Sequence, residues 1–139
     1  MFTFPIDYYL FVLAANIGVI QVIASMEKFH GILLIKSIIA TRILGITISA
    51  SSFIWFFFVT NRNINDYEGG LDANQQALLF FLGTLSAFAL TFIISSIVNA
   101  RMNNKEIDTE QGLGNLKHTN YLLAVKKNIR SWQKNGLPR

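Results

Sequence analysis

Residues 73–100 are ANQQALLFFLGTLSAFALTFIISSIVNA, a run of 28 positions without one charged side chain. A helix rises about 1.5 Å per residue, so roughly 20 mostly apolar residues cross the ~30 Å hydrocarbon core of a bilayer. This run is therefore long enough for one transmembrane helix. Two further uncharged runs precede it: residues 8–26, with 19 positions, and residues 43–60, with 18.

Three such runs predict an all-α membrane protein with three transmembrane helices. Strands are disfavoured because an open sheet edge in hydrocarbon leaves backbone groups without partners. None of the runs shows the polar–apolar alternation of a barrel strand. The composition agrees, since 14% of the 139 residues are charged, against about 25% in soluble domains. We expect residues 1–102 to form the transmembrane domain and residues 103–139 a separate tail.

The basic residues predict the orientation in the membrane. Of the 12 Lys and Arg residues, 11 lie either between the first two runs or after the third, and Arg62 is the exception. Because Lys and Arg accumulate in cytoplasmic segments, we expect the N-terminus and the 61–76 loop outside the cell and the tail in the cytoplasm. The net charge of +4 is then a signal of topology. The sequence thus predicts a multi-pass protein of the cell membrane without a nucleic-acid partner.

Residues 31–60 allow three arrangements. A single tilted helix of about 45 Å could carry Lys36 and Arg42 up to the inner headgroups by snorkelling. A short interfacial helix over residues 31–40 could instead precede a bend. Arg42 or Lys36 could also pair with a partner subunit.

Small residues at a spacing of four predict helix-packing faces, since they let two helices approach closely in lipid. The third run has four in register, and the first two runs have fewer. The expected packing residues are Ala14, Gly18, Gly45, Gly83, Ala87, Thr91 and Ser95. Asn16 and Gln21 should form hydrogen bonds across helices. We expect a compact three-helix bundle that docks on a larger membrane protein.

The loop NRNINDYEGGLDANQQ, residues 61–76, holds three of the eight carboxylates. Its spacing does not fit an EF-hand. Asp72 and Gln75 fit a capping box for the third helix, which leaves Tyr67 and Glu68 as the predicted contacts with a partner or with an ion. With no cysteine and two histidines 88 positions apart, the sequence predicts no metal, cofactor or catalytic residue of its own.

The tail carries an amphipathic pattern over about residues 119–135. Leu122, Val125, Ile129 and Trp132 follow a helical repeat, and basic residues occupy the opposite face. A basic amphipathic helix with a tryptophan is typical of a membrane surface with anionic headgroups. Docking on a partner subunit is the alternative. The predicted surface residues are Lys126, Lys127, Arg130, Trp132 and Lys134.

The segment QQALLFFLGTLSAFALTFIISSIVNARM, residues 75–102, and the three-span layout resemble a small accessory subunit of archaeal ammonia monooxygenase. The resemblance implies a noncatalytic subunit that stabilises a copper membrane monooxygenase oxidising ammonia. Larger integral-membrane subunits would then be its partners and would hold the copper.

Two alternatives remain open. Glu68 and Gln76-Ala77 resemble the three-span membrane anchor of reductive dehalogenases, which has glutamates in an outer loop, although the long tail departs from that pattern. A small homo-oligomeric transporter or channel is the second alternative. The absence of ionisable groups from mid-membrane positions favours an accessory subunit over a transporter.

Overall fold

The computed structural model describes residues 4–58 and 70–99, together with Lys126 and Ile129. These residues form three helices, α1 (Phe4–Met26), α2 (Ile38–Phe58) and α3 (Ala73–Val98). All three are long and apolar enough to cross a membrane. The prediction of an all-α protein with three candidate membrane spans is confirmed. Apart from Lys126 and Ile129, which are helical and exposed, the predicted tail helix lies outside the described residues.

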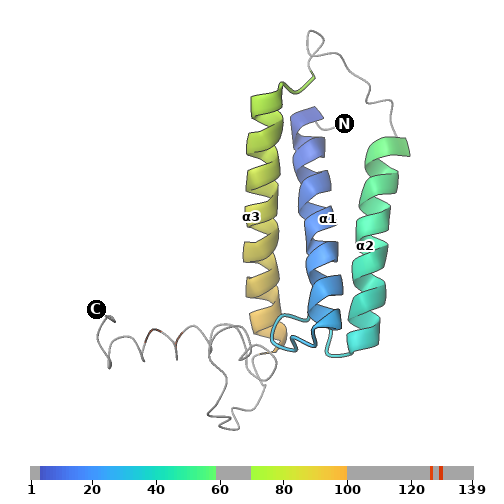
Figure 1. Cartoon of the computed structure of the whole chain (residues 1–139), viewed down its shortest axis with the longest axis vertical. Helices are drawn as coiled ribbons and strands as arrows, with labels where there is room; N and C mark the ends of the chain where they lie inside the picture. Colours follow the sequence, from blue (N-terminus) through green and yellow to red (C-terminus); the bar gives the residue numbers. More distant parts are fainter. Residues whose placement is uncertain (1–3, 59–69, 100–125, 127–128, 130–139) are drawn as a thin grey trace.

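The three helices stand side by side in a row with α1 in the middle (Figure 1). α1 packs against both neighbours, whereas residues 38–58 of α2 and 73–98 of α3 do not contact each other. The expectation of a compact bundle is therefore wrong. Gly45 of α2 and Gly83 of α3 both meet residues of α1, so the closest contacts of each outer helix are made with α1.

α2 begins at Ile38, seven residues later than a helix starting at Gly31 would. Turns and bends occupy residues 27–37, and Ser37 ends this segment by accepting bonds from two amides of α2. Its side chain accepts from the N–H of Ala40 and its carbonyl from the N–H of Thr41. A serine in this position satisfies amides that a helix start leaves without partners. Both the 30-residue helix and the interfacial helix over residues 31–40 are thus excluded.

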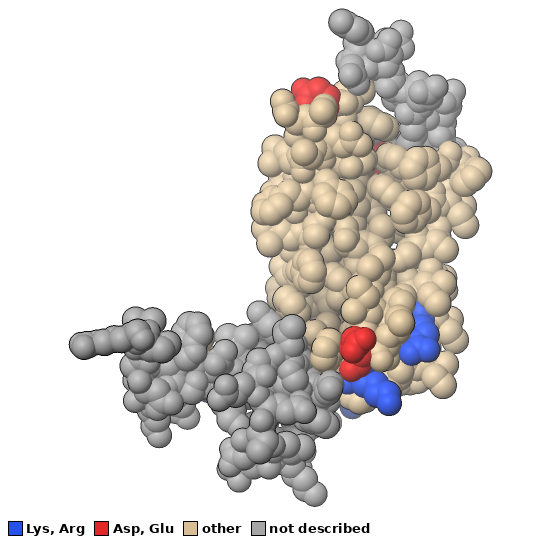
Figure 2. All heavy atoms as spheres, in the orientation of Figure 1, with Lys and Arg blue, Asp and Glu red and all other residues tan. Residues whose placement is uncertain are grey.

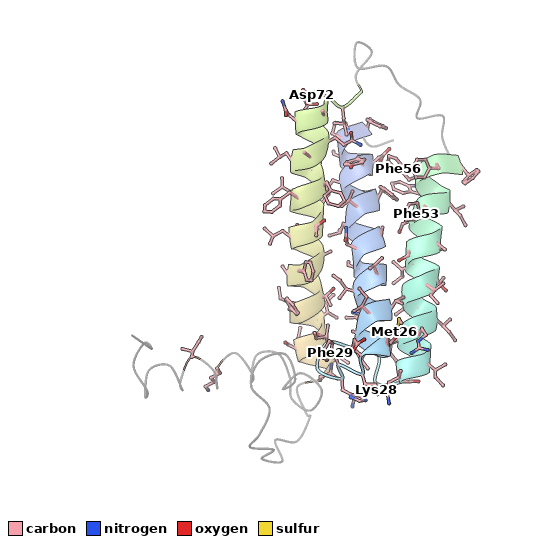
Figure 3. All side chains as sticks on the ribbon, viewed as in Figure 1. Met26, Lys28, Phe29, Phe53, Phe56 and Asp72 are labelled. Carbon is pink, nitrogen blue, oxygen red and sulfur yellow. The ribbon has the colours of Figure 1, made fainter. Side chains whose placement is uncertain are left out.

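Two apolar clusters hold α1 to its surroundings at opposite ends. At one end Leu33 is fully buried beside Ala24 and Ile32. At the other, α1 and α2 share a group of aromatic rings. Phe11 and Phe56 stack with their centroids 4.5 Å apart, and Phe53 meets Phe11 edge-on at 5.0 Å. Figure 3 shows Phe53 and Phe56 near the end of α2 that lies beside the start of α1.

Asp72 caps α3, as the sequence predicts. Its carboxylate accepts a hydrogen bond of 2.7 Å from the N–H of Gln75, and its backbone is extended. The negative charge lies at the positive end of the helix dipole, which adds to the stabilisation. Figure 3 shows Asp72 at the start of α3.

Candidate functional site

The α1–α2 contact is a crossing of two glycines, Gly18 and Gly45. A Cβ atom at Gly18 would lie 2.6 Å from the carbonyl oxygen of Gly45 and would collide with the Ser49 hydroxyl. A Cβ atom at Gly45 would lie 2.7 Å from the carbonyl oxygen of Gly18. The two backbones therefore touch directly, which only glycine permits. Ser49 adds a 3.2 Å hydrogen bond to the carbonyl of Ala15.

The α1–α3 contact uses the small-residue stripe of α3. Gly83, Ala87, Thr91 and Ser95 are all buried. A Cβ atom at Gly83 would lie 2.9 Å from the Cγ1 atom of Val12 on α1. The stripe is thus occupied inside the chain and is not a surface for another subunit. Ala14, the remaining packing residue predicted from the sequence, is half-buried on α1.

Polar side chains reinforce the α1–α3 contact. The Tyr9 hydroxyl donates to Ser86 Oγ at 2.8 Å. The Asn16 amide donates to Thr84 Oγ1 at 3.3 Å and to the carbonyl of Val12 at 2.8 Å. The predicted cross-helix bond of Asn16 is confirmed. Serine and threonine hydroxyls on α3 thus accept from longer side chains on α1.

The segment between α1 and α2, residues 27–37, is held by two buried amide side chains, and we call it the inner loop. Gln21 is fully buried; its Oε1 accepts from the N–H of Leu34 at 2.9 Å, and its Nε2 donates to the carbonyl of Ile32 at 3.4 Å. Asn99, which follows α3, donates from Nδ2 to the carbonyl of Leu33 at 2.9 Å. Gln21 therefore binds loop backbone, and the expectation that it bonds to another helix is wrong.

Three exposed basic residues accompany the inner loop, namely Lys28, Lys36 and Arg42. Lys28 has φ 57°, the left-handed conformation that reverses the chain after α1. Figure 2 shows the Lys and Arg atoms of the visible face at one end of the molecule, with Asp or Glu atoms beside them and further Asp or Glu atoms at the opposite end. Glu27, the first residue of the inner loop, is exposed.

Arg42 is positioned by a neighbour on α1. Its Nε atom donates to Ser25 Oγ at 3.3 Å, and Ser25 in turn donates to the carbonyl of Val22 at 2.7 Å. Ser25 is fully buried. These two hydrogen bonds therefore hold the Nε side of the guanidinium at the contact between α1 and α2. The alternative that Arg42 or Lys36 pairs with a partner subunit stays a prediction.

The remaining site residues expected from the sequence are not described. Tyr67 and Glu68 lie outside the described residues, as do Lys127, Arg130, Trp132 and Lys134. Among the described residues, no group of three or more His, Cys, Asp or Glu side chains could hold a metal ion.

Three residues of this site were not singled out from the sequence. They are Tyr9, Ser86 and Asn99, which carry bonds between distant parts of the chain. A hydroxyl or amide next to the end of an apolar run is the signal that could have found Tyr9 and Asn99, whereas Ser86 lies in the middle of its run. A comparison of the chain with family models, curated proteins and solved structures finds no match.

Proposed function

We propose that this chain is a noncatalytic small subunit that packs against larger integral-membrane subunits. The observation that carries the proposal is the open row of helices. With α1 between them, α2 and α3 turn long apolar faces outward, and Ile43, Phe57 and Leu85 are all more than half exposed. A row one helix thick offers two broad sides to neighbours, whereas a closed bundle would offer a smaller surface.

The distribution of charge supports the same proposal over a transporter. Asp7, in the first turn of α1, and Arg42, in the second turn of α2, are the sole Asp, Glu, His, Lys or Arg residues in the three helices. Proton and ion pathways use ionisable groups within the span. At mid-span the Asn16 amide of α1 donates to the Thr84 hydroxyl of α3. This hydrogen bond joins two neighbouring helices.

A more specific proposal follows from the resemblance of residues 75–102: the larger partner is a copper membrane monooxygenase that oxidises ammonia. In that complex the copper ligands would come from the partner subunits. The resemblance in sequence style and in number of spans is the support for this narrower proposal.

The test is isolation of the chain from its native membranes with a tag, in a mild detergent, followed by mass spectrometry of the co-purifying proteins and metal analysis. We expect larger multi-span proteins in fixed proportion, and copper if the narrower proposal holds. Copper-free multi-span partners would overturn the monooxygenase assignment alone. A partner resembling a reductive dehalogenase would favour the anchor. A particle made of this chain alone would favour the homo-oligomeric transporter.

We also propose that the start of α1 and the loop between α2 and α3 face the outside and that the inner loop and the tail face the cytoplasm. The support is the 11 of 12 basic residues on one side. Cysteines introduced at Asn65 and at Ser131 provide the test, since the chain has none of its own. An impermeant thiol reagent applied to intact cells should label Asn65→Cys and not Ser131→Cys, and the reverse pattern would invert the orientation.

The tail supplies a second contact with the membrane in this proposal. Residues 119–135 would form an amphipathic helix on anionic headgroups, with Lys126, Lys127, Arg130, Trp132 and Lys134 at the surface. Lys126 and Ile129 are both helical and exposed. Ionic strength tests it: binding of a peptide of residues 117–139 to anionic vesicles should weaken with salt and vanish on neutral vesicles. Equal binding to both vesicle types would contradict it.

A further inference from the structure

Arg42 occupies an unusual position in the molecule, because it is a fixed cation inside a membrane helix. It lies four residues beyond the start of α2, ~6 Å along the axis at about 1.5 Å per residue. Its neighbours at spacings of three and four on the helix surface are Ile39 and Ile46, which are 72% and 54% exposed. The guanidinium therefore lies where apolar side chains of α2 already face outward.

The isoleucines form a continuous apolar strip. Ile39, Ile43 and Ile46 repeat at spacings of four and three, and the middle one is 61% exposed. Such a strip suits an extended hydrocarbon chain that runs parallel to α2. Arg42 borders the strip near its end at the inner loop. An apolar strip with a cation beside its end is complementary to an amphiphile with an anionic head.

The Arg42 side chain is positioned by the protein itself, without a ligand. The bond from Arg42 Nε to Ser25 Oγ holds the Nε side of the guanidinium against α1. A guanidinium offers five N–H donors in a planar fork. Those on the Nη atoms match two oxygens of a phosphate group in a bidentate arrangement. Positioning by Ser25 reduces the ordering entropy that binding would otherwise cost.

The inner loop adds charge of the same sign. Lys28 and Lys36 of the inner loop are exposed, as is Glu27, and Figure 2 shows the Lys and Arg atoms of the visible face gathered at one end of the molecule. Because Gln21 and Asn99 fix the loop backbone, these lysines project from an ordered support. Basic residues next to a membrane span attract anionic lipid headgroups by about 1 kcal/mol each.

We propose that the α1–α2 seam at the inner loop binds one anionic phospholipid, with its phosphate on Arg42, Lys36 assisting and an acyl chain along Ile39, Ile43 and Ile46. The combination of phosphate-binding donors with the isoleucine strip selects a phospholipid over a free phosphate ion, which would use the cations alone. This site is separate from the tail and needs the chain to lie in a membrane, whether or not a partner complex exists.

The experiment uses the full chain purified in a mild detergent and native mass spectrometry. Phosphatidylglycerol or phosphatidylcholine is added in equal amounts, and the fraction of protein carrying one lipid is measured. The wild type should retain phosphatidylglycerol preferentially. Arg42→Gln should lower that preference about fivefold, the equivalent of ~1 kcal/mol per cation. Lys36→Gln should lower it less, and Ser25→Ala should weaken binding without any change of charge.

Arg62→Gln is the matched control, because it removes the same charge from the loop between α2 and α3. It should leave the preference unchanged. An equal loss in Arg62→Gln and Arg42→Gln would show that net charge alone governs binding and would overturn the site. A third arm adds inorganic phosphate. Displacement of the lipid by phosphate at low concentration, with the same dependence on Arg42, would assign the site to a free anion. If Arg42→Gln does not fold, Arg42→Lys, which keeps the charge, replaces it in the same lipid-binding measurement.

Discussion

Glycine is required at two positions in this protein for a steric reason. At the α1–α2 crossing, a Cβ atom at Gly18 would lie 2.6 Å from the carbonyl oxygen of Gly45, and a Cβ atom at Gly45 would lie 2.7 Å from the carbonyl oxygen of Gly18. At Gly83 the nearest atom is the Val12 Cγ1 atom at 2.9 Å, which belongs to a side chain. Backbone cannot move aside without shifting a whole helix, whereas a side chain adjusts locally.

Gly18→Ala should therefore destabilise the folded chain by about 1–3 kcal/mol through overpacking. Gly83→Ala should cost less, because the nearest atom there is a side-chain methyl of Val12 at 2.9 Å and not a backbone carbonyl. The gain of about 1 kcal/mol in helix propensity from glycine to alanine is common to both substitutions. Unfolding of the purified chain by a denaturing detergent, followed by circular dichroism, measures both. Equal destabilisation by the two substitutions would show that the α1–α2 backbones are not in direct contact.

Gln21 has a comparable importance for the inner loop. Gln21→Met keeps the size of the side chain but leaves the Leu34 N–H and the Ile32 carbonyl without their partner, at a cost of about 1–3 kcal/mol. The inner loop should then open more often. Trypsin cleavage after Lys28 and Lys36, followed by mass spectrometry, should become faster. Asn16→Leu removes an amide from the α1–α3 seam and is the control. Unchanged cleavage in Gln21→Met would contradict the proposed clamp.

At the scale of the elements, the ends of α2 and α3 are set by local chemistry. Ser37 and Asp72 precede the two helices, and each accepts from an amide in the first turn. Side-chain caps of this kind contribute about 1 kcal/mol. Both caps lie outside the apolar runs, where water competes for the amides.

Asp72→Ala should shorten α3 at its start. We expect a loss of about 1 kcal/mol of local stability and faster hydrogen exchange at the amides of Gln75 and Gln76. Asp72→Asn is the matched variant, since asparagine also caps but carries no charge, and its effect should be smaller. Slow exchange in Asp72→Ala would mean that the cap is not needed to hold this turn.

The helices and the Asp72 cap could be predicted from sequence because apolar runs and capping patterns are local. The contacts between residues far apart in the chain could not be predicted from sequence. From the sequence, residues 31–37 fit a helix that continues into α2, whereas their turns and bends follow from tertiary bonds to Gln21 and Asn99. The row arrangement was missed for a similar reason: small-residue stripes show that a helix packs closely, but not against which helix.

For the whole molecule, the row predicts which helices are neighbours. The Ser49 hydroxyl on α2 donates a hydrogen bond to the carbonyl of Ala15 on α1, so these two positions are neighbours. The double variant Ala15→Cys, Ser49→Cys should therefore form a disulfide under mild oxidation. Ile46→Cys with Leu85→Cys, on the exposed surfaces of α2 and α3, should not form one within a chain. Efficient cross-linking of the second pair within one chain would mean that the helices close into a bundle.

The bond between Asn99 and Leu33 joins residues 66 positions apart, and this separation has a consequence for synthesis. α1 and α2 are consecutive, so their glycine crossing can close while later residues are still on the ribosome. The carbonyl of Leu33 must wait for its donor until Asn99, which follows α3, has been made. The hydrogen bonds of the inner loop are therefore complete only after α3 has packed beside α1.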